Sequence, residues 1–357
     1  MQKAIVIQTI SEPARLVERS IPEPGKNQIL LHVTAASLNP LDQKTRDVGL
    51  FFKQSSQVLA HDIAGEVIQL GPDQNPPKFK VGDHVFAHAN FVPGKALTDC
   101  GGLQQYAIVD ARFAAKLDAA GLTDNEAATI PVCAMAAFIA LFHSTGLGIR
   151  IPSPQLVISQ SISCSADDSK AILVIGGGSN CGRFAIAFAR MCGFEQIITV
   201  AARRTAVELR ELGATHVIDR HASRDDIVRQ VREIADDGLV YALDTVNIGP
   251  GQELGLAALS NSKRGCLITL NPVNERDPEP SFIGKKIAGY ERRLTFGFSA
   301  LYPEVSTTFW NHIPAWVTAG YIRPLQYEVV EGLDVVRVNH VLDQYREGQG
   351  QKTVVRP

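Results

Sequence analysis

The chain has few of the features that mark a disulfide-bonded, membrane or nucleic-acid-binding protein. Its 357 residues include six cysteines, and no two of them form a Cys-x-x-Cys pair. A net charge of −2 leaves no basic surface for nucleic acid or an acidic membrane. The apolar runs are too short to cross a bilayer, and the N-terminus lacks a signal-peptide core. We therefore expect a cytoplasmic protein with free thiols and with neither membrane nor nucleic-acid partners.

The most informative stretch combines a strand, a glycine turn and a helix. Residues 171–175 are apolar throughout, which is typical of a parallel strand covered on both faces. The glycines that follow let backbone N–H groups approach a pyrophosphate, and the start of a helix favours its charge. The fingerprint reads Gly177-x-Ser179-x-x-Gly182, with serine at the middle glycine position. This segment predicts a dinucleotide-binding unit.

The end of the next predicted strand, residues 196–202, indicates which nucleotide binds. An NAD site usually ends this strand with an acid that accepts from the ribose 2′-hydroxyl. Here the strand runs into Arg203, Arg204 and Thr205 without an acid. The planar arginine fork suits a 2′-phosphate because it can donate two bonds to it. We predict NADPH over NADH; the alternative is that both arginines are solvated residues at a helix start.

Strand and helix signals divide the chain into regions. Short strands with Gly, Pro and Asp turns dominate the first third, and residues 125–146 favour helix. Residues 150–170 form a Pro- and Ser-rich connection. Strands and helices then alternate from residue 171, before a helix, two short strands, another helix and a last strand at 352–356. Further strands are expected at 29–35, 63–70, 84–87, 240–245 and 265–271. The two ends of the chain should therefore form one domain, with the substrate in the cleft between two domains.

Four motifs resemble the medium-chain dehydrogenase/reductase superfamily over essentially the whole chain. They are Ala36–Arg46, Leu59–Glu66, Val81–Phe86 and Gly101–Tyr106. Three later segments make the chain similar to the zinc-independent, quinone oxidoreductase-like branch, which includes fungal trans-acting enoyl reductases and yeast NADPH-dependent alcohol dehydrogenase-like proteins. These segments are Val240–Asp244, Thr269–Pro272 and Gln351–Arg356.

The resemblance implies an α/β fold of two domains. One is a GroES-like, β-rich catalytic domain of residues 1–135, completed by 310–357. The other is a Rossmann NADP-binding domain of residues 136–309. Related enzymes occur as monomers and homodimers, and the sequence does not choose between these states.

The resemblance also bears on zinc. Zinc-dependent members place a cysteine ligand where this chain has Asn39, and they carry four clustered cysteines in the region that here reads Ala89–Gly102 and contains one. A structural zinc site needs four ligands and a catalytic site usually three. We predict no zinc. The alternative is a remnant site of His61, Asp62 and Glu66.

Without a metal, another group must stabilise the charge that develops on a substrate carbonyl oxygen. The resemblance points to Lys44, which in enoyl reductases lies near the nicotinamide ribose and the active site. It could position the cofactor, donate a hydrogen bond or relay a proton, with Asp42 as its partner or a ribose ligand. The alternative is that Lys44 is a solvated surface lysine.

The resemblance implies further contacts. Cofactor-binding residues are expected at Leu41, Asp42, Gln43, Lys44, Gly178, Ser179, Asn180, Cys181, Arg203, Arg204, Thr205, Arg220, Leu270, Asn271, Gly348 and Gln349. A largely apolar substrate pocket is expected at Met135, Ala136, Phe138, Ile139, Phe296 and Phe298, although apolar residues of this kind are more often core.

The leading function is NADPH-dependent reduction of the C=C bond of an enone, enal or enoyl thioester. A trans-acting enoyl reductase of fungal secondary metabolism is its specific version, and it implies docking to a polyketide synthase acyl carrier. One alternative is zinc-independent reduction of an aldehyde, ketone or quinone by the same hydride donor, because fold alone does not choose between these reactions. Another is a non-catalytic NADPH-binding protein.

Overall fold

The chain packs as two compact units in the computed structural model, which describes residues 1–51, 56–72, 78–89, 99–152, 170–273 and 279–357. Unit 1 comprises residues 1–132, 298–318 and 323–357, and unit 2 comprises residues 133–297 and 319–322. Both chain ends therefore belong to unit 1. Most of the predicted Pro- and Ser-rich connection lies outside the described residues.

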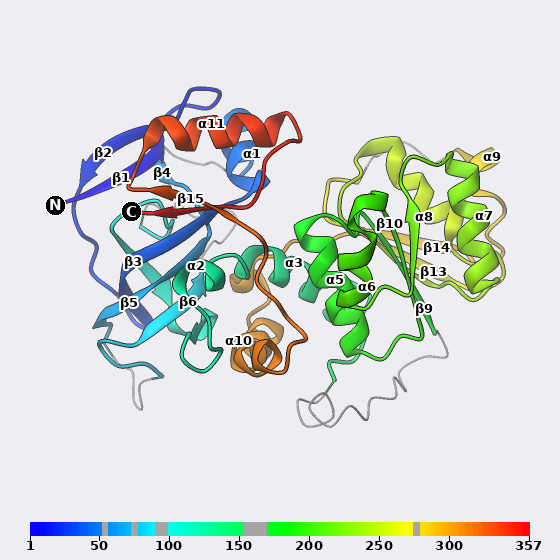
Figure 1. Cartoon of the computed structure of the whole chain (residues 1–357), viewed down its shortest axis with the longest axis horizontal. Helices are drawn as coiled ribbons and strands as arrows, with labels where there is room; N and C mark the ends of the chain where they lie inside the picture. Colours follow the sequence, from blue (N-terminus) through cyan, green and yellow to red (C-terminus); the bar gives the residue numbers. More distant parts are fainter. Residues whose placement is uncertain (52–55, 73–77, 90–98, 153–169, 274–278) are drawn as a thin grey trace. The chain divides into compact units, whose positions relative to one another are not determined.

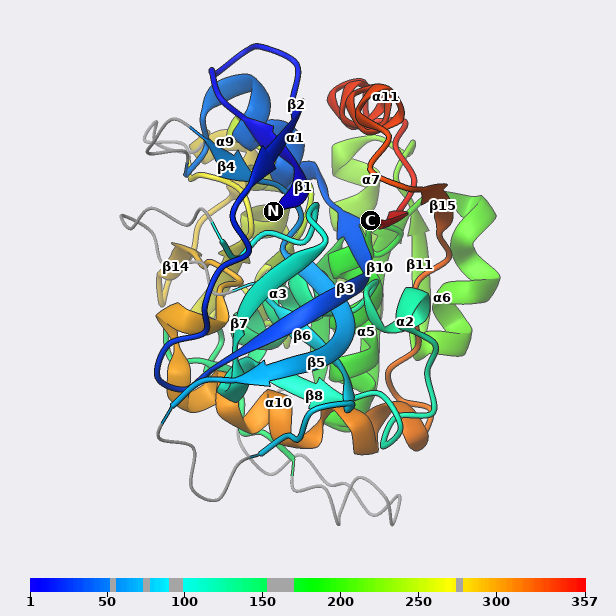
Figure 2. The same cartoon turned by 90° about the vertical axis from the view of Figure 1, so that its left-hand side faces the viewer.

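Unit 1 is built on antiparallel pairing around β3 (Gln28–Leu38). Its described residues form a seven-stranded sheet in the order β15-β16-β3-β5-β6-β8, with β7 also paired to β3 (Figure 2). A smaller sheet has the order β2-β1-β4. The other strands are β1 (Gln2–Ile7), β2 (Arg15–Arg19), β4 (Gln57–Val58), β5 (Asp62–Leu70), β6 (His84–His88), β7 (Tyr106–Asp110), β8 (Ala114–Lys116), β15 (Glu328–Glu331) and β16 (Thr353–Arg356).

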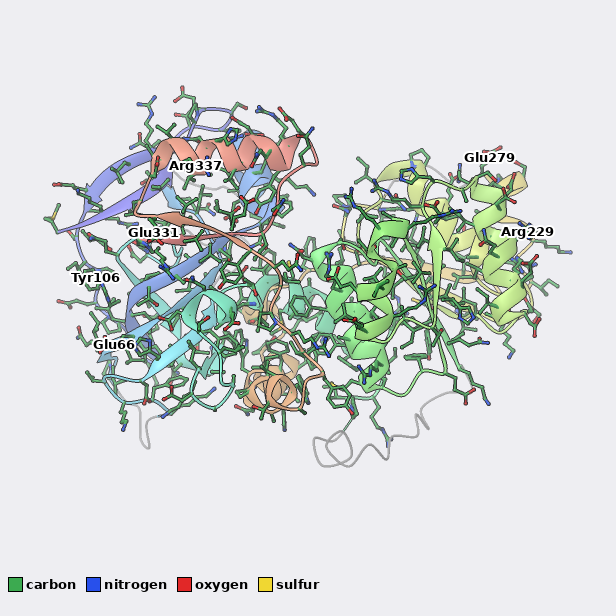
Figure 3. The ribbon with its side chains drawn as sticks, viewed as in Figure 1. Glu66, Tyr106, Arg229, Glu279, Glu331 and Arg337 are labelled. Carbon is green, nitrogen blue, oxygen red and sulfur yellow. The ribbon has the colours of Figure 1, made fainter. Side chains whose placement is uncertain are left out.

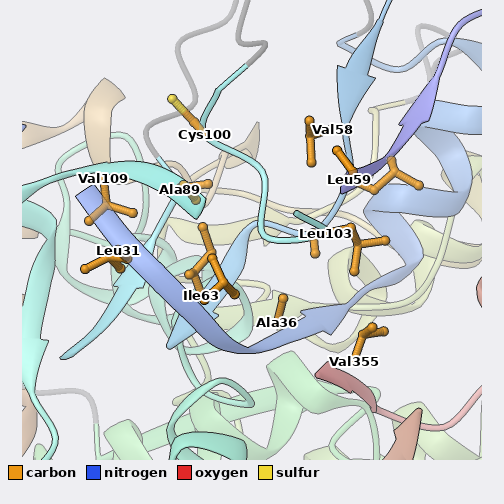
Figure 4. Packing of buried hydrophobic residues seen from close by; sticks show 14 of the residues in the cluster. Leu31, Ala36, Val58, Leu59, Ile63, Ala89, Cys100, Leu103, Val109 and Val355 are labelled. Atoms are coloured by element: carbon orange, nitrogen blue, oxygen red, sulfur yellow. The ribbon is translucent and has the colours of Figure 1, made fainter. Parts of the chain in front are cut away.

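The core of unit 1 joins distant parts of the chain. Leu31, Ile63 and Val109 come from three neighbouring strands and are fully buried (Figure 4). Val355 of the last strand pairs with Ala36 of β3. Burying each large aliphatic side chain contributes about 1.5–3 kcal/mol. The C-terminal strand is therefore an integral part of this unit.

Helices cover the edges of unit 1. They are α1 (Pro40–Val48), α2 (Asp124–Ala127), α10 (Pro303–Thr318) and α11 (Val335–Arg346), with short 3-10 turns η1 (Ala111–Phe113) and η4 (Ser299–Leu301). Pro40 starts α1, where its missing N–H is tolerated, and Gly49 ends it with φ +68°. The buried Arg46 of α1 donates to Asp343 of α11 at 2.7 Å, which ties the two helices together.

Unit 2 is a doubly wound parallel sheet. Its described strands follow the order β11-β10-β9-β12-β13-β14, and α5 and α6 cover one face while α7 and α8 cover the other (Figure 1). Strand order reverses between β9 and β12, where such sheets bind ligands at the carboxyl ends of the strands. The strands are β9 (Ala171–Ile175), β10 (Gln196–Ala201), β11 (His216–Asp219), β12 (Tyr241–Asp244), β13 (Gly265–Thr269) and β14 (Tyr290–Leu294). The helices are α3 (Pro131–Phe142), whose first two residues belong to unit 1, α5 (Asn180–Met191), α6 (Ala206–Leu212), α7 (Arg224–Ala235), α8 (Glu253–Ala258) and α9 (Pro280–Ile283), with 3-10 turns η2 (Arg203–Thr205) and η3 (Gly249–Gln252).

The predicted helix over residues 125–146 is in fact two helices, α2 and α3. Pro131 is the first residue of α3, because proline is accepted at a helix start and disrupts a helix interior. The stretch Asp124–Phe142 has the length and composition of a membrane span, yet 83% of its window is buried inside the protein. That burial is typical of a core helix.

The α/β fold class is confirmed, as are the main strands within one or two residues at most ends. Two details differ. The described residues between α10 and α11 form one strand, β15, instead of two, and α10 begins at Pro303, before the expected start after Trp310. The strand β14 was not predicted, because its sequence Tyr-Glu-Arg-Arg-Leu has no apolar run.

Candidate active site

Asp42 holds the start of α1 in place. One carboxylate oxygen accepts from the backbone N–H of Asn39 at 2.8 Å, and the other accepts from that of Ala60 at 2.7 Å. Ala60 has φ +66°, a conformation that non-glycine residues rarely adopt and that clusters at functional sites. Asp42 thus joins α1 to the strained turn before His61, and both of its oxygens are engaged.

A buried ion pair lies next to this helix start. Lys352, from the last strand segment, donates to Asp62 at 2.5 Å and to the side-chain oxygen of Asn39 at 2.9 Å. Asn39 in turn donates to Asp62 at 2.8 Å. The other Asp62 oxygen accepts from the backbone N–H of Val132 at 2.6 Å, in the first turn of α3. We call Asn39, Asp62 and Lys352 the buried ionic cluster.

Burial controls the protonation of the groups around the cluster. It raises the pKa of Asp42, against the opposing effects of His61 and of the two backbone donors. It lowers the pKa of His61, against the attraction of Asp42 and Asp62. Because an apolar environment disfavours the charged form of either group, His61 is a neutral imidazole at neutral pH.

The four predicted residues of α1 occupy two kinds of position. Asp42 is fully buried, whereas Leu41, Gln43 and Lys44 are half-buried. Gln43 donates to Asp47 one turn further on, at 2.8 Å. Lys44 lies in the middle of the helix whose start the buried ionic cluster and Asp42 hold.

Gly348 and Gln349 follow α11 in the same unit as α1. Gly348 has φ +72°, and the Gln349 N–H donates to the carbonyl of Gln344 at 2.9 Å. The Tyr345 hydroxyl spans this turn, with oxygen distances of 3.1 Å to the carbonyl of Leu38 and 2.7 Å to that of Gln351. The predicted segment therefore lies beside the end of β3.

The glycine turn of unit 2 requires its glycines. A Cβ at Gly182 would lie 2.2 Å from the carbonyl oxygen of Gly176, and one at Gly177 would lie 2.0 Å from the Thr199 hydroxyl. Both distances are far below contact, so side chains are excluded there. This close approach of strand, turn and helix leaves backbone N–H groups at the start of α5, which suits the pyrophosphate of a dinucleotide.

Ser179 replaces the middle glycine and caps α5. Its hydroxyl accepts from the Gly182 N–H at 3.0 Å and lies 2.8 Å from the Thr245 hydroxyl. The serine thus satisfies one of the N–H groups that a helix start leaves unpaired. Gly178 precedes it, and Asn180 and Cys181 are the first two residues of the helix, half-buried like Gly178.

The predicted phosphate ligands lie at the carboxyl end of β10 and beyond β11. Arg203 is exposed and pairs with Asp219 at 2.8 Å, whereas exposed Arg204 has no ion-pair partner among the described residues. Thr205 donates to the carbonyl of Ala202 at 2.8 Å. Arg220 is exposed and donates to the neighbouring His221 at 3.3 Å. The partner of Arg203 thus comes from the end of the neighbouring strand β11, which a pattern within one strand does not reveal.

Leu270 and Asn271 follow β13. The Leu270 N–H donates to the carbonyl of Asp244 at 3.1 Å, and the Asn271 carbonyl accepts from the Thr269 hydroxyl at 2.8 Å. The buried Gln252 amide also donates to the carbonyl of Pro272 at 3.0 Å. These bonds hold the predicted nicotinamide border in a defined conformation.

The predicted pocket residues are mostly core residues of their own unit. Met135, Phe138 and Ile139 on α3 are fully buried. Phe138 packs against Phe142 at 4.6 Å and Phe188 at 5.4 Å between ring centroids. Gly297 lies so close to Ala136 that a Cβ would be 2.6 Å from its Cα. Phe296 is 37% exposed, and Phe298 belongs to unit 1. A pocket role for these residues stays a prediction.

A surface depression of about 460 Å³ on unit 2 lies away from all of these residues. Its lining is Asp225, Val228, Arg229, Arg232, Glu233 and Phe282. Figure 3 labels Arg229 of α7 and also Glu279, the residue directly before α9, at the same end of the unit. The lining mixes both charge signs and contains no residue of the predicted site.

The donor set does not fit a metal. In the part of the chain that the structure describes, no three His, Cys, Asp or Glu side chains are grouped as ligands. Asp62 and the Asn39 oxygen already bind an ammonium group, and a dication there would have to displace a buried lysine. Glu66 lies four residues along β5 from Asp62, about 13 Å by strand rise. These residues do not form the remnant site that was the alternative.

Two families match the chain. Residues 25–119 match "Alcohol dehydrogenase GroES-like domain", and residues 181–304 match "Zinc-binding dehydrogenase". The chain is 33% identical over 348 residues to Dehydrogenase azaJ of Aspergillus niger, covering 95% of this chain and 93% of that protein. It is 28% identical over 275 residues to Trans-enoyl reductase fumoC of Cordyceps fumosorosea, covering 73% of this chain and 66% of that protein.

A solved structure has the same fold. A mycobacterial protein complexed with NADPH superposes with a TM-score of 0.73 at 19% identity, with all of both chains covered. The chain belongs to the medium-chain dehydrogenase/reductase family and is an oxidoreductase with a GroES-like domain and a Rossmann-like sheet. The Rossmann-like fold of this family binds a nicotinamide cofactor.

Sequence reasoning did not single out Lys352 or His88. Lys352 lies more than 300 residues from Asn39 in sequence, so no local pattern connects them. The one available signal is a lysine directly before the C-terminal strand with its two valines, because a charge beside a buried strand must be paired when it is itself buried.

Proposed function

We propose that this protein is an NADPH-dependent, zinc-independent reductase of α,β-unsaturated carbonyl compounds. When bound, NADPH would supply the hydride for the β carbon, and a proton from water would add at the α carbon, giving the saturated carbonyl compound and NADP⁺. The name of the relative from Cordyceps fumosorosea, a trans-enoyl reductase, supports this reaction type.

The observation that carries the proposal is the buried ionic cluster. Lys352 and Asp62 are 3% and 0% exposed, so the lysine charge is internal to the fold. Because Lys352 already engages the oxygens of Asp62 and Asn39, the cluster supports stabilisation of charge on the substrate oxygen by hydrogen-bond donors and not by a zinc ion.

Lys44 is the first candidate for a hydrogen-bond donor in the active site. Asp42 and the buried ionic cluster hold the start of the helix that carries Lys44, which supports a defined place for the backbone of that lysine. We assign Lys44 to cofactor positioning or hydrogen bonding. Asp42 acts by positioning, because both its oxygens accept backbone N–H bonds.

Residues that would hold the cofactor fit that group. The pyrophosphate would bind the N–H groups from Gly178 to Cys181, because the turn has no room for side chains at the adjacent glycines. Arg204 is the main candidate for the 2′-phosphate, since Arg203 is paired with Asp219. Thr205, Arg220, Leu270, Asn271, Gly348 and Gln349 complete the proposed set.

The proposed substrate is a small enone or enal, or an enoyl thioester. In the thioester case the partner would be the acyl carrier of a polyketide synthase in fungal secondary metabolism. The proposed location is the cytoplasm, and the oligomeric state is a monomer or a homodimer.

The test is oxidation of NADPH with benzylideneacetone, followed by mass spectrometry of the product. We expect the saturated ketone. Lys44→Ala should lower turnover more than tenfold, whereas Lys3→Ala, an exposed lysine of β1 in the same unit, should not change it. An allylic alcohol would assign carbonyl reduction instead, and NADPH binding without consumption would indicate a non-catalytic protein.

A further inference from the structure

His88, the last residue of β6, belongs to none of the groups assigned above. It is fully buried. Its Nδ1 lies 3.0 Å from the Ser299 hydroxyl oxygen, which also lies 3.1 Å from Nε1 of the buried Trp310. These three side chains form a hydrogen-bonded chain within unit 1.

This chain fixes the tautomer of His88. An indole N–H only donates, so the Ser299 oxygen accepts from Trp310. Among the described residues, the acceptor in reach of the Ser299 hydroxyl hydrogen is Nδ1 of His88. With Nδ1 as an acceptor, the proton of the neutral imidazole is on Nε2. The opposite arrangement would leave the Ser299 hydroxyl hydrogen buried without an acceptor.

The Nε2–H group is thus a buried donor. In the part of the chain that the structure describes, Nε2 of His88 has no hydrogen-bond partner. Leaving such a buried donor unsatisfied is destabilising, and it therefore calls for an explanation such as a bound ligand or water.

The surroundings of His88 are aromatic. Its ring stacks on Phe298, with centroids 6.2 Å apart and planes inclined by 24°. Phe51 meets the same Phe298 ring edge-on at 5.2 Å. His61 and Asp62 are the titratable groups that act on His88, and Asp62 is its register partner on β5. The negative charge of Asp62 is already balanced by Lys352.

We propose that the Nε2–H of His88 binds the carbonyl oxygen of the substrate, with Phe298 and Phe51 against the conjugated, apolar part. This inference rests on the proposed function and names the oxygen-binding donor of the same reaction. A neutral donor beside aromatic rings suits a neutral conjugated carbonyl compound, whereas a carboxylate would lack a countercharge. No proton is transferred: the hydrogen bond strengthens as negative charge develops on the oxygen during hydride transfer.

The first experiment measures binding without turnover. The saturated ketone benzylacetone, isotope-labelled at its carbonyl, is bound to the enzyme in the presence of NADP⁺, and its carbonyl stretch is recorded by infrared difference spectroscopy. We expect a lower frequency with the wild-type enzyme than with His88→Phe. The matched control His84→Phe, a half-exposed histidine on the same strand, should leave the band unchanged.

The tautomer is tested by NMR of the labelled histidine ring nitrogens. A protonated Nε2 in the wild-type enzyme and a changed tautomer ratio in Ser299→Ala are expected. A protonated Nδ1 in the wild type would overturn the proposal, as would a carbonyl band that is the same in the wild type and His88→Phe. The latter result would mean that Nε2–H binds a buried water only.

The second experiment uses turnover of benzylideneacetone. His88→Phe should lower kcat/KM about a hundredfold, at the lower end of the roughly 10²- to 10³-fold loss in kcat seen on removing one oxyanion-hole donor. His88→Gln, whose amide N–H can replace Nε2–H, should restore part of that loss, which a purely structural role would not predict. If the wild type reduces no C=C bond but the band shifts as expected, the donor site holds and the proposed function fails. If C=C reduction is observed and His88→Phe is unimpaired, the donor assignment fails.

Discussion

The buried ionic cluster of unit 1 and the nucleotide turn of unit 2 are built in opposite ways. Asn39, Asp62 and Lys352 are at most 3% exposed and hold one another by side-chain bonds. The nucleotide turn depends on backbone geometry, and its phosphate candidates Arg203 and Arg204 are exposed. Charges inside the fold are coupled to folding, whereas exposed charges are available for a ligand.

This difference explains why the two regions should respond differently to mutation. A buried charge that loses its partner destabilises the protein, because the remaining charge stays desolvated. An exposed arginine that is removed leaves no buried charge behind, so the change should be measured as weaker nucleotide binding. Stability and affinity therefore separate the two regions experimentally.

The largest expected effect is that of Lys352→Met on stability. The substitution leaves Asp62 buried without its cation, and it should lower the free energy of unfolding by about 3–5 kcal/mol. Urea denaturation followed by fluorescence measures this value. Lys170→Met, which removes an exposed lysine paired with Glu195, is the matched control and should cost about 0–1 kcal/mol. Equal losses in the two variants would contradict the distinction between the regions.

Lowering the pH should have an intermediate effect on the free energy of unfolding. Burial, with a smaller contribution from His61, lowers the pKa of His88 from 6.5 to about 3. Between these values the unfolded chain binds a proton that the folded chain does not, so stability falls as pH decreases below 6.5. The loss should approach about 1.4 kcal/mol per pH unit from His88 alone. His61, whose pKa burial also lowers, adds to it, whereas the raised pKa of Asp42 acts in the opposite direction.

The measurement is the free energy of unfolding at several pH values for the wild type and His88→Phe. From neutral pH to about two units below 6.5, the wild type should lose about 3 kcal/mol more than the variant. Parallel curves for the two proteins would show that His88 is not a buried neutral imidazole.

The smallest effect is expected at the exposed arginines. Arg204→Ala should raise KM for NADPH about tenfold, because a charge-assisted bond to phosphate contributes about 1.5–3 kcal/mol. Arg203→Ala should have less effect, since Asp219 already binds Arg203. Initial rates with NADPH and with NADH measure the effect of each substitution on KM. The free energy of unfolding should be the same in both variants as in the wild type. A loss of the same size with NADH would remove Arg204 from the phosphate site.

The local elements could be predicted because their signals are local. The apolar run 171–175, the glycine turn and Pro40 before α1 each indicate a structure through a few neighbouring residues. The strand β14 could not be predicted, because pairing with β13 and not apolar character makes it a strand. The continuous helix over 125–146 was wrong at Pro131, although proline is itself a recognised helix boundary.

Candidate site residues could be recognised within short segments of the sequence, but the contacts between those segments could not. Lys44 and Asp42 share one helix, and Gly178 to Cys181 share one turn. Three features of the site depend on partners from other elements. They are the bond that the Asp42 carboxylate accepts from Ala60, the ion pair of Arg203 with Asp219, and the contact with Ser299 that orients His88.

Local sequence patterns are enough to predict the α/β class, the family and the dinucleotide turn, because hydrophobic period and glycine spacing act over a few residues. The contacts of Lys352 with Asn39 and Asp62, and that of Ser299 with His88, follow from the folding of the whole chain. These contacts join segments more than 200 residues apart. Folding brings polar residues that are distant in the sequence into one buried cluster. A local sequence pattern does not indicate which of these residues will be in contact.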